Sequence, residues 1–226
     1  MRIAAVPTLD ELVSSPQFPS LVQAAMGVSS PQIRNMGTIG GDLCQRPRCW
    51  YFRGGLGLLG MKDGSSLVVN GENKYHAIFG GGPAYFVSAS SFGPVLVALD
   101  AKISIASPTA TRVVKAADFF LAPKDEKTRK IALAPNEIVP EISIPGGSTN
   151  ATYEVRHKEG LDWPLVTASV ALKMSGKSVT SASVVLGHVA PTPWNSTAAR
   201  RRWPARRSMN RSPKPLVLPP RKARVH

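Results

Sequence analysis

The residues best suited to binding chemistry form the run Thr38-Ile39-Gly40-Gly41-Asp42. Two adjacent glycines follow a β-branched pair and precede a short acid. Glycine has no Cβ, so its backbone amide can come close to a phosphate group or an aromatic ring. The same step between apolar residues is also typical of a tight turn or a bulge. The run is therefore a candidate binding segment whose ligand has to be inferred from its surroundings.

The residues around the glycines make the pattern more specific. Segment 32–41 reads QIRNMGTIGG, and it is followed by Leu43 and by segment 45–53, QRPRCWYFR. This stretch resembles the second flavin-binding segment of the FAD-binding medium subunits of molybdenum hydroxylases. That family includes xanthine dehydrogenase, carbon monoxide dehydrogenase and aldehyde oxidoreductase. The resemblance covers roughly residues 3–194 and lacks the family's beginning, so we expect an N-terminally truncated flavoprotein.

The resemblance implies an oxidoreductase component that binds FAD and transfers electrons. Its expected partners are a molybdopterin-binding large subunit and a [2Fe–2S] small subunit, from whose clusters electrons would pass through this flavin to an external acceptor. The flavin carries that chemistry, so no catalytic side chain is expected. Two alternatives stay open: a truncated inactive fragment or scaffolding subunit, and a basic nucleic-acid-binding protein that acts through its tail.

Five positions carry over from the family most directly. The resemblance places Thr38 and Ile39 along the flavin and gives Gly40 and Gly41 as sources of backbone amides. Asp42 stands where the family usually has Asn. An ionised Asp only accepts hydrogen bonds, so a carboxylate beside the flavin would either disfavour its reduction or stay protonated.

Three further positions have a weaker match. Val28 and Val139 correspond to apolar positions that touch the flavin ring in the family, and a place in the hydrophobic core is the alternative for each. Ser91 corresponds to a position where many relatives have a cofactor-contacting aspartate, and a helix cap is its alternative.

The sequence predicts no metal centre. Related aldehyde oxidoreductase subunits hold an iron–sulfur cluster, which needs four thiolates, whereas this chain has only Cys44 and Cys49. The four histidines lack the spacing of a zinc site. No Ser-His-Asp or Cys-His arrangement is apparent in the sequence either.

Charge is concentrated at one end of the chain. Of the 28 Lys and Arg residues, ten lie in 195–226, which contains no acid, so residues 1–194 carry 18 bases against 14 acids. A nucleic-acid partner is therefore not expected for the body of the protein. Apolar runs are too short to span a bilayer, and with two cysteines and no visible leader peptide we expect a cytoplasmic protein.

The expected fold class is α+β, with three parts. Residues 1–120 would form a partial FAD-binding domain of the molybdopterin-dehydrogenase type, without its N-terminal subdomain. Residues 121–194 would form an incomplete C-terminal domain with a three-stranded antiparallel sheet and a helix. Residues 195–226 would be a tail that is disordered or the product of a frameshift. The expected helices and strands are 8–13 with a Thr cap, 18–26, a helix capped near Ser90 or Ser91, a hairpin of 102–106 with 111–115, and strands 166–174 and 181–186.

Overall fold

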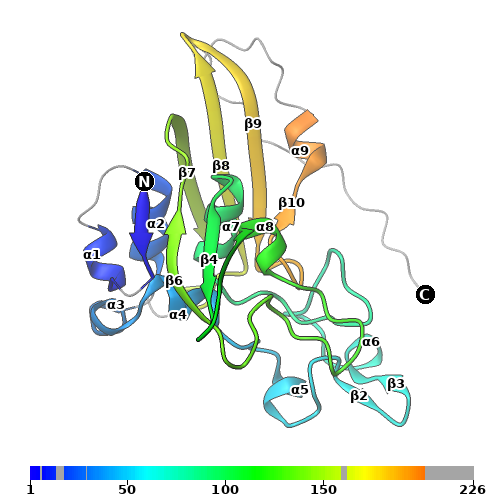
Figure 1. Ribbon diagram of the computed structural model, residues 1–226. Coiled ribbons are helices and arrows are strands. Elements are labelled where there is room, and N and C mark those ends of the chain that lie inside the picture. The colour runs from blue at the N-terminus through cyan, green and yellow to red at the C-terminus, as the bar shows by residue number, and fades with distance from the viewer. Residues whose placement is uncertain (6, 14–17, 29, 159–161, 202–226) are drawn as a thin grey trace.

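A computed structural model describes residues 1–5, 7–13, 18–28, 30–158 and 162–201 (Figure 1). Strands and short helices alternate in the first half of the chain, and the second half is mostly strand, which confirms the α+β expectation. No helix within the described part of the chain is long and apolar enough to cross a membrane.

The first five elements carry the candidate binding segment. They are β1 (Arg2–Ala4), α1 (Leu9–Val13), α2 (Pro19–Gly27), α3 (Pro31–Met36) and α4 (Ile39–Leu43). The predicted capping box opens α1, because the Glu11 amide donates to the Thr8 hydroxyl and the Thr8 amide donates to the Glu11 carboxylate. α2 begins at a proline, as expected at a first helical position.

Turns dominate the next stretch of chain, as its glycines predict. It contains α5 (Trp50–Arg53), β2 (Met61–Lys62), β3 (Ser65–Ser66) and α6 (Leu67–Asn70). In Figure 1 this segment lies at one end of the molecule, away from α1–α3. A small core of its own holds it together, built from Leu59, Ala84 and Phe86.

A four-stranded antiparallel sheet has the order β1-β6-β4-β5. Its last three strands are β6 (Ile138–Ser143), β4 (Lys102–Ala106) and β5 (Thr111–Lys115). The β4–β5 pair is the predicted hairpin, with Lys102 opposite Lys115. β6 pairs with both β1 and β4, so a strand expected in the second domain belongs to the first sheet.

The second sheet has the order β10-β9-β8-β7 and therefore four strands, not the three predicted from sequence. Its strands are β7 (Ser148–Val155), β8 (Val166–Ser175), β9 (Ser178–Gly187) and β10 (Trp194–Asn195). The two predicted strands β8 and β9 are joined by a tight turn in which Gly176 adopts φ +56°. The additional strand β10 has only two residues, and Gly187, Pro191 and Pro193 precede it. So short a strand shows no alternating pattern that could be recognised in the sequence.

The two sheets share one hydrophobic core that surrounds α7 (Phe92–Ala98). Phe92, Val95 and Leu96 are completely buried in it. α7 packs against β8 and β9 of the second sheet, and against α2, α4 and the short helix α8 (Ala116–Phe119). The same core includes Ile103 of β4 and Val185 of β9, so α7 joins the two sheets.

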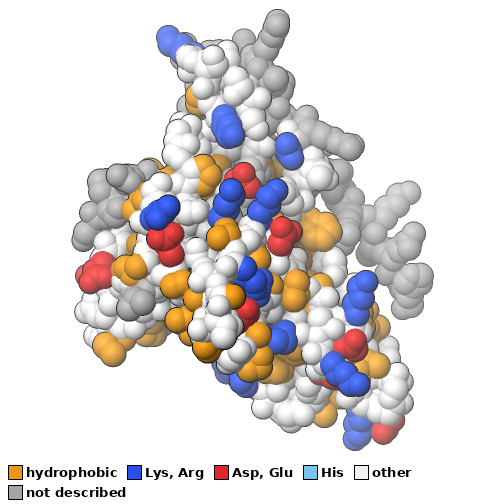
Figure 2. All heavy atoms as spheres, viewed as in Figure 1, with side chains coloured by type: hydrophobic (Ala, Val, Ile, Leu, Met, Phe, Trp, Pro, Cys, Tyr) orange, Lys and Arg blue, Asp and Glu red, His pale blue; other side chains and the backbone are white. Residues whose placement is uncertain are grey.

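The beginning of the predicted tail packs on the second sheet. The Ser196 amide donates to the Val184 carbonyl at 2.9 Å, and Ala199 on α9 (Thr197–Arg201) is buried. The remaining tail, 202–226, lies outside the described residues. On the face drawn in Figure 2, Lys and Arg side chains are interspersed with Asp and Glu and do not gather in one basic patch.

Close packing of α7 on β9 yields a first prediction. A Cβ added to Gly187 would lie 2.5 Å from Cγ of Pro94 and 3.3 Å from Cβ of Thr167. We expect Gly187→Ala to lower the free energy of unfolding by about 1–3 kcal/mol, the usual cost of overpacking a core. Urea unfolding followed by tryptophan fluorescence measures the change.

Gly146→Ala is the matched control, because a Cβ at Gly146 meets no atom within 4 Å. Equal unfolding midpoints for the two variants would show that α7 and β9 are less tightly packed than described.

Candidate functional site

The glycine pair begins a helix and does not form a loop. Thr38 caps α4 with its side chain, which accepts a hydrogen bond from the Gly41 amide at 3.0 Å. The Gly40 amide donates to the Ala5 carbonyl at 3.2 Å. Both glycine amides therefore have partners inside the protein, although the sequence suggested that they face a ligand.

Gly40 and Gly41 differ in how the surrounding structure would accept a side chain. A Cβ on Gly40 would lie 3.0 Å from Cβ and 3.1 Å from the carbonyl oxygen of Ala5, so packing alone favours glycine there. A Cβ on Gly41 would meet only the Thr38 hydroxyl, at 3.1 Å, and the residue is exposed. The fold thus leaves the Gly41 side of the segment open to approach. Ile39, by contrast, is fully buried in the main core.

The Asp42 side chain points into the protein, whereas the sequence analysis placed it beside the flavin. Only 6% of the residue is exposed. Its carboxylate accepts hydrogen bonds from the Ser90 hydroxyl and from the amides of Ser91 (3.4 Å) and Phe92 (3.1 Å). These are the first amides of α7, so Asp42 caps that helix from a distant part of the chain.

Capping of α7 tests the helix-cap interpretation of Ser91, which occupies the N-cap position. Its side chain makes no capping hydrogen bond. The neighbouring Ser90 hydroxyl accepts from the Gly93 amide at 2.8 Å, so Ser90 and Asp42 together fill the role predicted for Ser90 or Ser91.

A chain of polar contacts leads from Asp42 towards the molecular surface. Gln45 Nε2 donates to Asp42 Oδ2 at 2.8 Å, and the Arg48 guanidinium donates to Gln45 Oε1. The Arg48 guanidinium carbon lies 3.7 Å from the centroid of the Trp163 ring, a cation–π contact. Asp42 is thus linked to Arg48 and Trp163 through Gln45.

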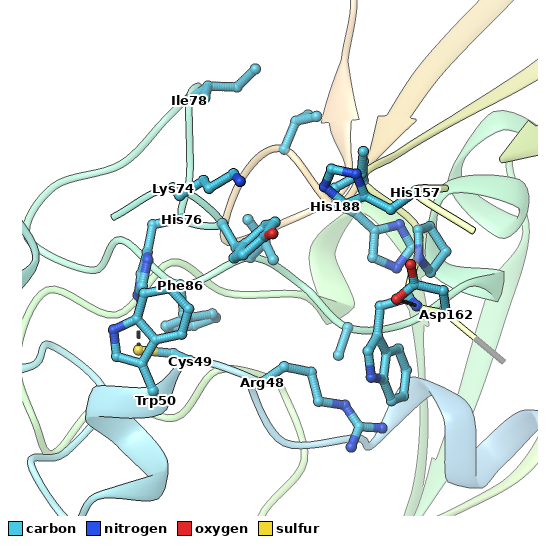
Figure 3. Close-up of a pocket in the computed structure, with 17 residues that line it drawn as sticks. Arg48, Cys49, Trp50, Lys74, His76, Ile78, Phe86, His157, Asp162 and His188 are labelled. Carbon is cyan, nitrogen blue, oxygen red and sulfur yellow. Dashed lines mark hydrogen bonds between the residues drawn. The ribbon is translucent and has the colours of Figure 1, made fainter. Parts of the chain in front are cut away.

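Arg48 and Trp163 line a cavity of about 490 Å³. Figure 3 shows its walls, which come from the turn-rich segment, from the segment after β7 and from the end of β9. The lining is rich in rings and in titratable groups. The rings are Trp50, Tyr75, His76, Phe86, His157, Trp163 and His188. A cavity of this size with largely aromatic walls is typical of a site for a small ligand.

Two buried imidazoles on the cavity wall each have an unsatisfied nitrogen. His76 and His188 are 6% and 8% exposed, and Nδ1 of His76 and Nε2 of His188 have no hydrogen-bond partner among the described residues. In Figure 3, His76 lies beside Cys49 and Trp50, and His188 lies near His157 and Asp162. Buried polar atoms are normally hydrogen-bonded, and the backbone carbonyl groups of Asn73 and Ala89 lie near the His76 and His188 rings, respectively.

Burial keeps both rings neutral. It lowers the pKa of His188 to about 4 and also lowers the pKa of His76. The backbone carbonyl group of Ala89 partly raises the pKa of His188, and that of Asn73 partly raises the pKa of His76. His188 Nδ1 lies 3.0 Å from the Thr167 hydroxyl. At neutral pH each imidazole can therefore offer a ligand one donor or one acceptor.

The cavity contains a Cys-His pair that was not apparent in the sequence. Cys49 Sγ lies 3.1 Å from His76 Nε2, although the residues are 27 positions apart. Sequence spacing gives no sign of this contact, because a turn-rich segment brings the two together. Among the residues that the structure describes, no group of three or more His, Cys, Asp or Glu is placed to hold a metal ion.

The other predicted contact residues lie elsewhere. Val28 and Val139 are partly buried against the main core, and neither is among the residues that line the cavity. Thr38 and Gly41 are not among the lining residues either, and Asp42 is linked to the cavity wall through Gln45 and Arg48. Flavin contact by the two valines stays a prediction. Sequence reasoning missed the cavity itself, for which the sequence offers one signal, the four Phe and Tyr residues within 75–86.

A family model described as the FAD binding domain in molybdopterin dehydrogenase matches residues 1–147. The chain is 29% identical over 185 residues to the aldehyde oxidoreductase FAD-binding subunit PaoB of Escherichia coli K12, covering 79% of this chain and 57% of that protein. It is 27% identical over 206 residues to the carbon monoxide dehydrogenase medium chain of Hydrogenophaga pseudoflava, covering 88% and 56%. The chain thus spans a little over half the length of these relatives.

Solved structures show the same likeness. A carbon monoxide dehydrogenase from Hydrogenophaga pseudoflava that lacks the Mo-pyranopterin moiety of the molybdenum cofactor matches with a TM-score of 0.62 and 25% identity, covering 89% of this chain and 57% of that one. Quinoline 2-oxidoreductase from Pseudomonas putida 86 matches with a TM-score of 0.63 at 20% identity, covering 91% and 57%, a likeness of fold alone.

The burial of Asp42 yields a prediction for stability against pH. Loss of solvation raises the pKa of Asp42 to about 6 from an ordinary value near 3.8, against the lowering effect of its hydrogen bonds. The folded protein therefore binds this proton more tightly, and the stabilisation present below pH 4 is lost as the pH rises through 6. A shift of this size corresponds to about 3 kcal/mol.

Asp42→Asn cannot titrate and isolates the effect. We expect the stability of the wild type relative to this variant to fall by about 3 kcal/mol between pH 4 and pH 7, measured by urea unfolding at each pH. A constant difference across that range would mean that the Asp42 carboxyl titrates normally.

Proposed function

The chain belongs to the family of FAD-binding domains of molybdopterin dehydrogenases, and we propose that it is the FAD-binding, electron-transferring part of a molybdenum hydroxylase. The observation that carries the proposal is the cavity of about 490 Å³ with its aromatic walls. The flavin ring is planar and has apolar faces and a polar edge. Those are the features that such a cavity would complement.

Several residues would hold the cofactor. Trp163 and Trp50 offer faces for stacking, His76 and His188 offer polar atoms for the ring edge, and Arg48 provides a fixed positive charge. Thr38 and Gly41 border an open surface at the start of α4, which suits a more extended part of the same molecule.

FAD, when bound, would supply the redox chemistry, accepting electrons and passing them on. The side chains would bind and orient it. The Asp42–Gln45–Arg48 chain would fix the guanidinium over Trp163, and a charge held beside a flavin changes the ease of its reduction. Neutral imidazoles at His76 and His188 would contribute hydrogen bonds without additional charge.

The proposed partners are those of the relatives' complexes: a molybdopterin-binding large subunit, where substrate is oxidised, and a small subunit with [2Fe–2S] clusters. Both are proposals for this chain, as is the division into two domains. Because β6 pairs with β1 and β4, we now propose the domain boundary after Ser143 and not after Phe120.

The first test is the cofactor itself. We expect the protein, purified and incubated with FAD, to show the visible absorption bands of an oxidised flavin at one flavin per chain after gel filtration. A colourless protein that also fails to quench flavin fluorescence in titrations would reject the proposal.

Trp163 is the residue that tests the cavity as the site. It is half exposed on the cavity wall, so Trp163→Ala should leave the fold intact and raise the Kd for FAD about tenfold, since an aromatic contact is worth about 1 kcal/mol or more. Tyr153→Ala is the matched control, because Tyr153 is 74% exposed on β7 and does not line the cavity. Equal affinities in the two variants would place the flavin elsewhere.

Gly41 tests the glycine segment separately. Gly41→Leu should keep the wild-type melting temperature, because the residue is exposed and leucine favours a helix. If FAD passes over this surface, its Kd should rise by about tenfold, or about 1.4 kcal/mol. Gly146→Leu is the control at an open surface glycine. An unchanged Kd for Gly41→Leu would assign the segment a purely structural role.

A further inference from the structure

The thiol of Cys49 forms a pair with the imidazole of His76, which is also proposed to hold the flavin, so the chemistry proposed below belongs to the protein without bound FAD. Their contact, at 3.1 Å between Sγ and Nε2, lies on the wall of the cavity, and Cys49 is only partly buried. When Nε2 accepts the thiol hydrogen, a neutral imidazole carries its own hydrogen on Nδ1. That is the buried nitrogen without a partner among the described residues. The arrangement therefore leaves Nε2 as the hydrogen-bond acceptor for the thiol, through which the thiol proton can pass during the reaction.

The charges around the pair favour an anion. Arg48 and Lys74 line the same cavity as Cys49, and Asp162 is the only carboxylate among the lining residues that the structure describes. Trp50 also stands next to the pair, with its ring centroid 5.0 Å from that of His76.

We propose that Cys49 is a thiol-modification site, activated by His76, that reacts with small anionic disulfides entering the cavity. The Cys49 proton passes to His76 Nε2, and Sγ attacks one sulfur of the disulfide. A new S–S bond forms to Cys49 while the S–S bond of the reagent breaks, and its second sulfur leaves with the bonding pair as a thiolate. Cys49 is oxidised, the released half is reduced, and the proton returns from His76 to the solvent.

Cys44 provides a control within the same chain. It is also partly buried, but it does not line the cavity, and burial raises the pKa of its thiol. Its backbone carbonyl, and not its sulfur, accepts a hydrogen bond from Lys130 at 3.4 Å. The two free cysteines therefore differ in the features that the proposal requires.

The test is the rate of reaction with dithionitrobenzoate, an anionic aromatic disulfide that releases a coloured thiolate. We expect a fast phase of one equivalent, about tenfold or more faster than the second. Cys49→Ser should abolish the fast phase and Cys44→Ser should retain it, and peptide mass mapping of the briefly treated wild type should find the adduct on Cys49. Equal rates for the two cysteines, or a fast phase at Cys44, would overturn the proposal.

Two further measurements separate activation from simple exposure. His76→Gln keeps a polar side chain but removes the base, and it should slow the fast phase about tenfold, with circular dichroism confirming the fold. The second measurement uses the wild type and a cationic disulfide, cystamine. Each rate is divided by the rate of free cysteine with the same reagent, and this ratio should be lower for cystamine than for dithionitrobenzoate. An unchanged rate in a folded His76→Gln protein, or no preference for the anion, would reduce Cys49 to an ordinary exposed thiol.

Discussion

The hydrogen bonds of the buried Asp42 carboxylate are the interaction on which the candidate site depends. They tie α4, which carries the glycine pair, to the first turn of α7, the helix at the centre of the protein. A carboxylate without solvent is costly, and the donors from Ser90, Phe92 and Gln45 offset part of that cost. The same carboxylate fixes Gln45 and, through it, Arg48. The Asp42 carboxylate thus helps to position both the glycine segment and one wall of the cavity.

The position of α7 explains why small residues surround it. A Cβ on Gly93 would lie 2.8 Å from Cζ of Phe120, and one on Gly187 would lie 2.5 Å from Cγ of Pro94. These glycines let the helix come close to its neighbours on two sides. His188 follows Gly187 directly and has φ +63°, so the same close approach turns its ring towards the cavity at the end of β9.

Local patterns were enough to predict the elements whose contacts are local. The hairpin of β4 and β5 and the pair β8 and β9 follow from alternation and turn residues. The glycine segment was identified as a binding candidate, but its helical form and the inward direction of Asp42 were not predicted. Both depend on contacts with Ala5 and Ser90, which are far away in the sequence.

The cavity could not be predicted from local sequence patterns either, because its walls come from residues far apart in the sequence. Its walls join Arg48 and Cys49 to His76, Trp163 and His188, and no spacing rule relates positions so far apart. Two-residue strands such as β10 cannot be predicted either, because two residues are too few to show a repeating pattern. A buried Cys-His contact across 27 residues needs the fold before it can be recognised.

The arrangement of the first sheet has a consequence for folding. β1 pairs with β6, with Arg2 opposite Ser143, so two neighbouring strands lie far apart in the sequence. Ile3 of β1 belongs to the main core and becomes buried only when this pairing forms. Contacts of such long sequence separation form slowly and leave apolar surface exposed until they do, unlike those of the local hairpin of β4 and β5.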